Sequence, residues 1–126
     1  MFGSRHVNVE TVVYTDYSGK SDRISYYAVK VCNYSGEEYL YDYGTKDVSL
    51  KYRRRPTDGE LKGVRWAMRL FPGARIKTDC MFAKEEMSYS GLVEHVKGHS
   101  GVPGNENADY LAKYDRLHPD YCSVWY

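Results

Sequence analysis

A chain of 126 residues is long enough for one domain with its own hydrophobic core. Hydrophobic residues make up 42% and charged residues 28%, with no long Pro, Gly or Ser tract, which excludes the disordered and low-complexity classes. The net charge of +1 excludes a strongly basic protein that binds nucleic acid through its overall charge, so such a function needs a local site.

The chain carries no sign of export or membrane insertion. Residues 1–6 lack the apolar core of a secretory signal, and no apolar run reaches the roughly 18 residues of a membrane span. Cys32, Cys80 and Cys122 are odd in number and far apart, which is typical of thiols in a reducing compartment. We therefore expect a cytoplasmic protein that does not bind a membrane.

The N-terminal part of the chain has the pattern of three β-strands. β-Branched residues at 7–15 predict a strand that ends at Asp16 and is followed by a turn. Residues 24–33 and 38–43 have the same pattern and are separated by a Ser-Gly pair, which predicts an antiparallel meander. The pattern of residues 47–55 is ambiguous.

The rest of the chain alternates helix and strand. Apolar residues with helical spacing predict a helix at 58–70, which a Pro-Gly pair ends. A strand at 74–78, a brief helix at 80–87 and a strand at 92–97 are expected next, and a last helix at 105–116 follows a Gly-rich loop.

This order predicts a single α/β domain. We expect a mixed sheet of five strands, three antiparallel and then two parallel, with helices packed on it. The core covers about residues 7–113, and residues 114–126 form a tail that ends in Val-Trp-Tyr. The tail either packs on its own domain or docks a protein partner through its aromatic end.

Four carboxylates follow strands or lie on helices: Asp16, Glu60, Asp79 and Asp109. Each has a structural explanation when it is taken singly. Asp16 suits the start of a turn, Glu60 lies three residues after Thr57 as in a capping box, and Asp79 suits a helix cap. Asp109 is placed to pair with Lys113 one turn later.

Taken together, the same four carboxylates predict a metal site. The ends of the first and fourth strands flank a crevice in many α/β sheets, and Glu60 shares a helix stripe with Val64 and Ala67 that faces the sheet. Clustered carboxylates repel one another unless cations neutralise them, and hard oxygen ligands favour Mg²⁺ or Mn²⁺. Two such ions can promote hydrolysis of a phosphodiester.

Several motifs resemble those of a known family. Residues 96–113, VKGHSGVPGNENADYLAK, resemble the His-loop and final-helix signature of type 1 ribonuclease H, including retroelement versions. Residues 14–16 are similar to the family's first strand and acid, residues 60–61 to its helix acid, and residues 76–79 to its fourth-strand acid. The resemblance spans about residues 7–113 and implies a ribonuclease H-like fold.

The resemblance also implies an activity, which is hydrolysis of the RNA strand of an RNA/DNA hybrid with two Mg²⁺ or Mn²⁺ ions, leaving a 3′-hydroxyl and a 5′-phosphate. Asp16 would bridge both ions, Asp79 would hold the ion that carries the attacking water, and Glu60 with Asp109 would hold the other. His99 would assist proton transfer and product release.

This chain departs from the family in the segments that contact the substrate. Only 12 residues, 80–91, separate the fourth-strand acid from the next strand, so there is no room for the basic protrusion that many relatives insert. Residues 55–59 stand where the family often carries an Asn-rich turn that contacts the hybrid, and we expect Thr57 to take up that contact. We expect further substrate contacts from Asn105 and from Arg53, Arg54 and Arg55, although charge runs are usually only solvated.

Three hypotheses follow from the sequence. The first is a monomeric ribonuclease H acting on RNA/DNA hybrids. The second is a nuclease of the same fold that acts on another duplex or requires a partner. The third is a non-catalytic nucleic-acid-binding or protein-binding module. His95 is interpreted as structural, because no pair of cysteines completes a zinc site with it.

Overall fold

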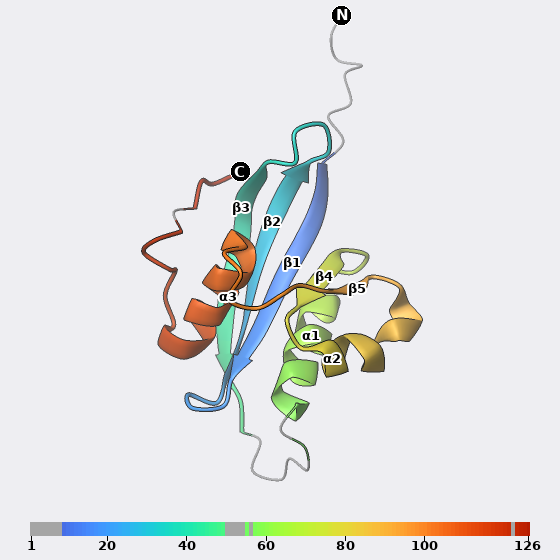
Figure 1. Cartoon of the computed structure of the whole chain (residues 1–126), viewed down its shortest axis with the longest axis vertical. Coiled ribbons are helices and arrows are strands. Elements are labelled where there is room, and N and C mark those ends of the chain that lie inside the picture. The colour runs from blue at the N-terminus through green and yellow to red at the C-terminus, as the bar shows by residue number, and fades with distance from the viewer. Residues whose placement is uncertain (1–8, 50–54, 56, 122) are drawn as a thin grey trace, which may run out of the picture.

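The computed structural model describes residues 9–49, 55, 57–121 and 123–126. They form an α/β structure with a five-stranded mixed sheet in the order β3-β2-β1-β4-β5 (Figure 1). The elements in chain order are β1 (Val9–Ser18), β2 (Arg23–Cys32), β3 (Glu38–Asp47), α1 (Asp58–Leu70), β4 (Arg75–Thr78), α2 (Met81–Glu86), the 3₁₀ helix η1 (Ser88–Ser90), β5 (Val93–His95) and α3 (Pro103–Tyr114).

The strand directions confirm the predicted mixed sheet. β1, β2 and β3 are antiparallel neighbours, whereas β4 pairs parallel with β1 and β5 pairs parallel with β4. α1 agrees with its predicted range at both ends, and β2, β4 and α2 agree to within one residue at each end. Of the ambiguous range 47–55, residues 50–54 lie outside the described part of the chain.

Two strands are longer than predicted. β1 runs through Asp16 to Ser18, and β3 continues to Asp47 instead of ending at Tyr43. Both extensions pair with β2, because Ser18 and Asp47 each lie opposite Arg23. Asp16 is therefore part of a strand and does not begin a turn, which corrects the structural explanation offered for it.

The last strand and the last helix also differ from the prediction. β5 covers only Val93–His95 of the predicted 92–97, since its parallel pairing with β4 stops there. α3 occupies Pro103–Tyr114 instead of 105–116, because proline suits the first turn of a helix. Asp115 then adopts a left-handed conformation, with φ of 57°, and ends the helix.

Hydrophobic cores cover both faces of the sheet. α1 and α2 lie on one face and α3 on the other (Figure 1). The first core includes Val13, Val64 and Ile76, all without solvent exposure, and the second includes Tyr14 and Leu111. Burying an aliphatic side chain of this size contributes roughly 1.5–3 kcal/mol, so the two cores hold the helices on the sheet.

Hydroxyl groups attach α3 to the sheet. The Ser25 hydroxyl donates to the carbonyl oxygen of Ala108 over 2.6 Å, and the Ser21 hydroxyl donates to that of Ala112 over 2.6 Å. Ala108, Leu111 and Ala112 face the sheet as the sequence predicts, with exposures of 0 to 1%. α3 is thus fixed beside the ends of β1 and β2.

The backbone of the C-terminal tail bonds to its own domain, whereas the side chains of Val124, Trp125 and Tyr126 stay exposed. The backbone N–H of Leu40 donates to Val124 over 2.7 Å, and the N–H of Tyr126 donates to Leu40 over 2.8 Å, so the tail lies along β3. The Tyr27 and Ser123 hydroxyls are 2.6 Å apart and join the tail to β2. No helix in the described ranges is both long enough and apolar enough to cross a membrane.

Replacing Gly104 by Ala tests the contact between α3 and β1. A Cβ at Gly104 would overlap the ring of Tyr14, which is 1% exposed and donates its hydroxyl to Glu38 over 2.9 Å. We expect Gly104→Ala to lower the free energy of unfolding by about 2 kcal/mol, because overpacking forces a buried ring to move. Urea denaturation measures this change.

Gly19→Ala is the matched control, because a Cβ there meets only the Tyr17 ring at ordinary contact distances of 3.8 and 3.9 Å. Its free energy of unfolding should stay within about 0.5 kcal/mol of the wild type. Equal effects of the two substitutions would contradict the role of the close contact between Gly104 and Tyr14.

Candidate metal centre

Asp16 projects from β1 at the point where β4 ends. The last β1–β4 pair joins Thr15 and Thr78, so Asp16 is the first residue of β1 beyond that pairing. Asp16 is 4% exposed, and its Oδ1 accepts a 2.8 Å hydrogen bond from the backbone N–H of Tyr17. A buried carboxylate thus lies on the part of β1 that β4 no longer covers.

Glu60 comes from the first turn of α1. Val64 and Ala67 on the same stripe have no solvent exposure, which confirms that this stripe faces the sheet. The capping-box explanation is not borne out, because the Thr57 side chain makes no cap hydrogen bond. Oε2 of Glu60 is buried, and the described residues offer it no hydrogen-bond partner.

Asp79 directly follows β4. Gly98 makes room for it, since a Cβ at Gly98 would lie 3.0 Å from Oδ2 of Asp79. Asn105 of α3 is 1% exposed, and its hydrogen bond to Asp79 favours the charged carboxylate. Asn105 therefore lies inside the site, beside an acid, and supports it from within.

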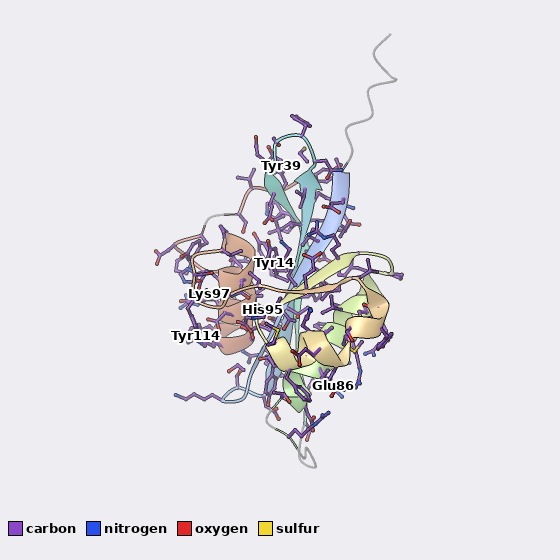
Figure 2. The ribbon with its side chains drawn as sticks, turned by 45° about the vertical axis from the view of Figure 1, so that its right-hand side comes forward. Tyr14, Tyr39, Glu86, His95, Lys97 and Tyr114 are labelled. Atoms are coloured by element: carbon purple, nitrogen blue, oxygen red, sulfur yellow. The ribbon has the colours of Figure 1, made fainter. Side chains whose placement is uncertain are left out.

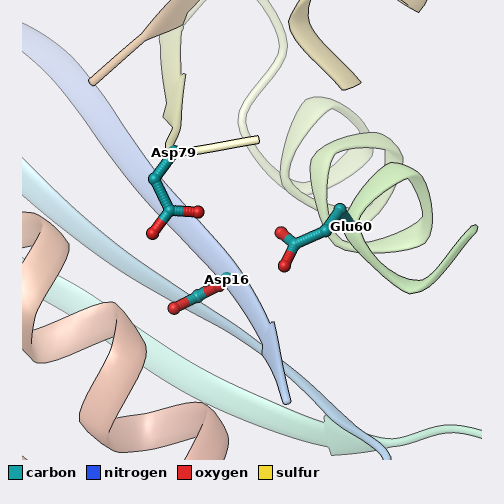
Figure 3. A group of neighbouring side chains, drawn as sticks. All are labelled: Asp16, Glu60 and Asp79. Carbon is teal, nitrogen blue, oxygen red and sulfur yellow. The ribbon is translucent and has the colours of Figure 1, made fainter. Parts of the chain in front are cut away.

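Asp16, Glu60 and Asp79 meet in one group. Each offers a carboxylate oxygen, and these ligand atoms all lie within 4.8 Å of one another. Figure 3 shows the three carboxyl groups facing a common space from β1, α1 and the end of β4. Three elements far apart in the sequence thus supply one cluster.

The pKa values of the cluster are raised because the charged forms are buried together. Burial raises the pKa of Asp16 well above its usual range, and the charges of Glu60 and Asp79 add to this. Burial and the charge of Asp79 raise the pKa of Glu60 to about 8. Burial also raises the pKa of Asp79, although hydrogen bonding from Asn105 opposes the shift.

Asp109 lies next to this group but is not a member of it. Its carboxylate forms an ion pair with Nζ of Lys113 over 3.2 Å, as one interpretation of the sequence expects. Its negative charge still raises the pKa of Asp16 and of Glu60, so it lies near the cluster. The structure therefore brings together three of the four predicted acids and turns the fourth toward Lys113.

Two histidines lie on the Asp79 side of the cluster. His99 is exposed, with a left-handed backbone at φ of 54°, in the loop between β5 and α3. Figure 2 shows His95 at the end of β5, between α3 and α2. Both lower the pKa of Asp79, and the interpretation of His95 as structural stays a prediction.

Of the arginines predicted to contact substrate before α1, one is engaged within the domain and two lie outside the described residues. Arg55 forms ion pairs with Asp58 over 3.1 Å and with Glu86 over 3.5 Å, and it stacks over the Phe82 ring at 4.7 Å. Arg53 and Arg54 lie outside the described residues. Thr57 is half-buried beside Arg55 and Asp58, at the start of α1.

Sequence reasoning missed the glycines that allow this approach. A Cβ at Gly63 would lie 3.4 Å from the backbone oxygen of Asp16, and one at Gly59 would overlap the Tyr17 ring. α1 therefore needs small residues where it crosses β1. The only sequence signal was two glycines four residues apart in a predicted helix, which is unfavourable for helix formation without a packing reason.

The cluster fits a divalent cation by its donor chemistry. Asp16, Glu60 and Asp79 supply hard oxygen donors of the kind that Mg²⁺ and Mn²⁺ prefer. The buried Glu60 oxygen without a hydrogen-bond partner is a second sign, because such an atom costs free energy until a proton or a cation satisfies it.

No protein-family model and no curated protein matches this sequence.

Glu60→Gln tests the electrostatic cost of the cluster. The folded chain holds a proton on Glu60 up to a pKa of about 8, whereas the ordinary value is 4.5. Since the folded state binds more protons in this interval, the free energy of unfolding should fall as pH rises through it. With chelator present, the free energy of unfolding of wild type should fall between about pH 5 and pH 8 by at least about 1 kcal/mol more than that of Glu60→Gln.

Urea denaturation at several pH values measures this difference. Adding Mg²⁺ or Mn²⁺ should reduce it, because a cation that binds only the folded cluster stabilises wild type. Parallel stability curves for wild type and Glu60→Gln across the whole pH interval would show that Glu60 carries no raised pKa.

Proposed function

We propose that this chain is a ribonuclease H that hydrolyses the RNA strand of RNA/DNA hybrids with Mg²⁺ or Mn²⁺. The observation that carries the proposal is the convergence of Asp16, Glu60 and Asp79, whose oxygens lie within 4.8 Å of one another where the pairing of β1 with β4 ends. The order of strands in the sheet is consistent with a ribonuclease H-like layout.

The residues of the cluster have distinct tasks in this proposal. Asp16, Glu60 and Asp79 would hold the ions, which when bound would supply an activated water and charge stabilisation for the leaving oxygen. Asp109 completes the acidic set, and it must leave its ion pair with Lys113 to do so. The hydrogen bond from Asn105 orients the Asp79 carboxylate and favours its charged form, against the effect of burial.

His99 supplies the proton step in this proposal. It is exposed in the loop before α3 and lies near enough to Asp79 to lower the pKa of that carboxyl, so it is placed at the edge of the site. The resemblance of residues 96–113 to the ribonuclease H signature supports both this role and the choice of an RNA/DNA hybrid as substrate.

A cleavage assay tests the proposal. The pure chain is incubated with labelled RNA/DNA hybrid, duplex RNA and duplex DNA, in Mg²⁺, Mn²⁺ or chelator. We expect cleavage of the hybrid RNA strand only with metal, leaving a 3′-hydroxyl and a 5′-phosphate. Cleavage of another duplex alone would favour a different nuclease activity, and no cleavage in any metal would leave a binding module.

Asp16→Asn is the matched variant for this assay. It removes a charged ligand but little volume, and it relieves repulsion in a buried cluster, so the chain should remain folded. Its hybrid cleavage should fall below detection, while circular dichroism should match wild type. A variant that cuts at the wild-type rate would exclude Asp16 as a metal ligand.

His99→Ala should slow hybrid cleavage by about a hundredfold without abolishing it, because a positioned acid or base accelerates a reaction but the ions remain. The left-handed φ of 54° makes strain an alternative cause of the loss. His99→Asn separates the two, since Asn tolerates that conformation and lacks an imidazole. Both variants should lose activity equally, and normal rates in His99→Asn would exclude the proton-transfer role.

A further inference from the structure

A groove lies beside Lys113, the residue that forms an ion pair with Asp109. It has a volume of about 430 Å³ between the β1–β2 turn and the end of α3. We call it the α3 groove and define it by its lining residues Ser18, Lys20, Ser21, Lys113 and Tyr114. Two lysines, two serines and one tyrosine thus line one hollow.

The α3 groove adjoins the candidate metal centre. Ser18 follows Asp16 by two residues on β1, so both side chains lie on the same face, about 7 Å apart along the strand. On the opposite wall, Lys113 pairs with Asp109 over 3.2 Å. A strand with a phosphate at the carboxylate cluster would therefore enter or leave through this groove.

The charge of the α3 groove suits a phosphate group. Lys20 is exposed in the β1–β2 turn, and no carboxylate among the described residues forms an ion pair with it. The Ser21 hydroxyl donates to the Ala112 carbonyl over 2.6 Å, so its position beside Lys20 is fixed. The Ser18 hydroxyl accepts from the Ser21 N–H over 3.4 Å and keeps its own proton to donate, so an exposed ammonium group beside it is a combination that binds phosphate oxygens.

Tyr114 adds an aromatic surface that is held in place from behind. Its ring is 56% exposed and lies 4.5 Å from the Tyr110 ring, which in turn lies 4.5 Å from His118. Figure 2 shows Tyr114 at the end of α3. Arg116 stacks over Tyr110 at 5.5 Å and adds positive charge to this row of rings.

The C-terminal tail fixes this row. The backbone N–H of His118 donates to Oδ1 of Asn107 over 2.9 Å, and the Asn107 side chain donates to the Tyr121 carbonyl over 3.2 Å. Asn107 has no solvent exposure, so the tail is attached to α3 through a buried amide. Tyr114 is therefore an exposed ring on a preorganised base.

We propose that the α3 groove binds a phosphate and the adjoining base of the nucleic-acid strand at the metal centre, with Lys20 contacting the phosphate and Tyr114 stacking on the base. This inference rests on the proposed function, since it assigns a grip for the substrate of the same site. Cationic grooves with aromatic side chains hold nucleic-acid strands in this way with little sequence preference.

Binding measurements test the α3 groove independently of cleavage. Fluorescence anisotropy of a short labelled RNA/DNA hybrid is followed in chelator, so no strand is cut, with single-stranded RNA and duplex DNA as further probes. Lys20→Glu should weaken hybrid binding by about tenfold, and Lys20→Ala should lower the slope of log affinity against log salt by about one. Arg69→Glu, at the exposed C-terminal end of α1, is the charge-matched control and should bind as wild type.

Tyr114 is tested with a conservative rescue. Tyr114→Ala should weaken hybrid binding by about fivefold or more, as expected when one stacked base is lost, and Tyr114→Phe should restore it. Tyr34→Ala is the control, because Tyr34 is 81% exposed and follows β2 at the opposite end of β1 and β2. Circular dichroism checks that every variant is folded.

The outcomes separate the two proposals. Wild-type affinity and salt dependence in Lys20→Glu and Tyr114→Ala would overturn the α3 groove, even if wild type cuts the hybrid. Weakened binding in both, with no cleavage by wild type in any metal, would overturn the ribonuclease activity and retain the groove as a nucleic-acid site. Loss of binding in Tyr114→Phe equal to that in Tyr114→Ala would exclude stacking.

Discussion

The repulsion among three clustered carboxylates, one buried and two half-buried, is the constraint on which the rest of this structure depends. Asp16, Glu60 and Asp79 converge within 4.8 Å, and burial raises the pKa of each. Holding such groups together away from water costs free energy until protons or cations compensate their charge. The rest of the fold therefore has to supply the free energy that holds the cluster together.

The two hydrophobic cores provide that stabilisation. One core holds α1 against the sheet and so fixes Glu60, whereas the other holds α3 against the opposite face and so fixes Asn105. β1 lies at the centre of the sheet and takes part in both cores. The pairing of β4 with β1 ends at Thr15, one residue before Asp16. The strand that takes part in both cores therefore also presents Asp16 to the site.

α3 connects the cluster to a surface that suits a nucleic-acid strand. Asn105 contacts the Asp79 carboxylate, whereas Lys113 and Tyr114 at the end of the helix line the α3 groove. The tail supports this end of α3 through Asn107. With a net charge of only +1, the chain cannot rely on its overall charge to hold a polyanion, and a local groove of this kind meets that need.

The sequence by itself determined the order of the elements, the directions of the strands and the bounds of α1, because these depend on local periodicity and on Pro and Gly signals. It also identified the three acids that meet. Only the tertiary structure decided that β1 continues past Asp16, since β2 sets that length by pairing, and that Asp109 turns to Lys113. The close approaches at Gly63 and Gly98 likewise depend on residues distant in the chain, which no local pattern records.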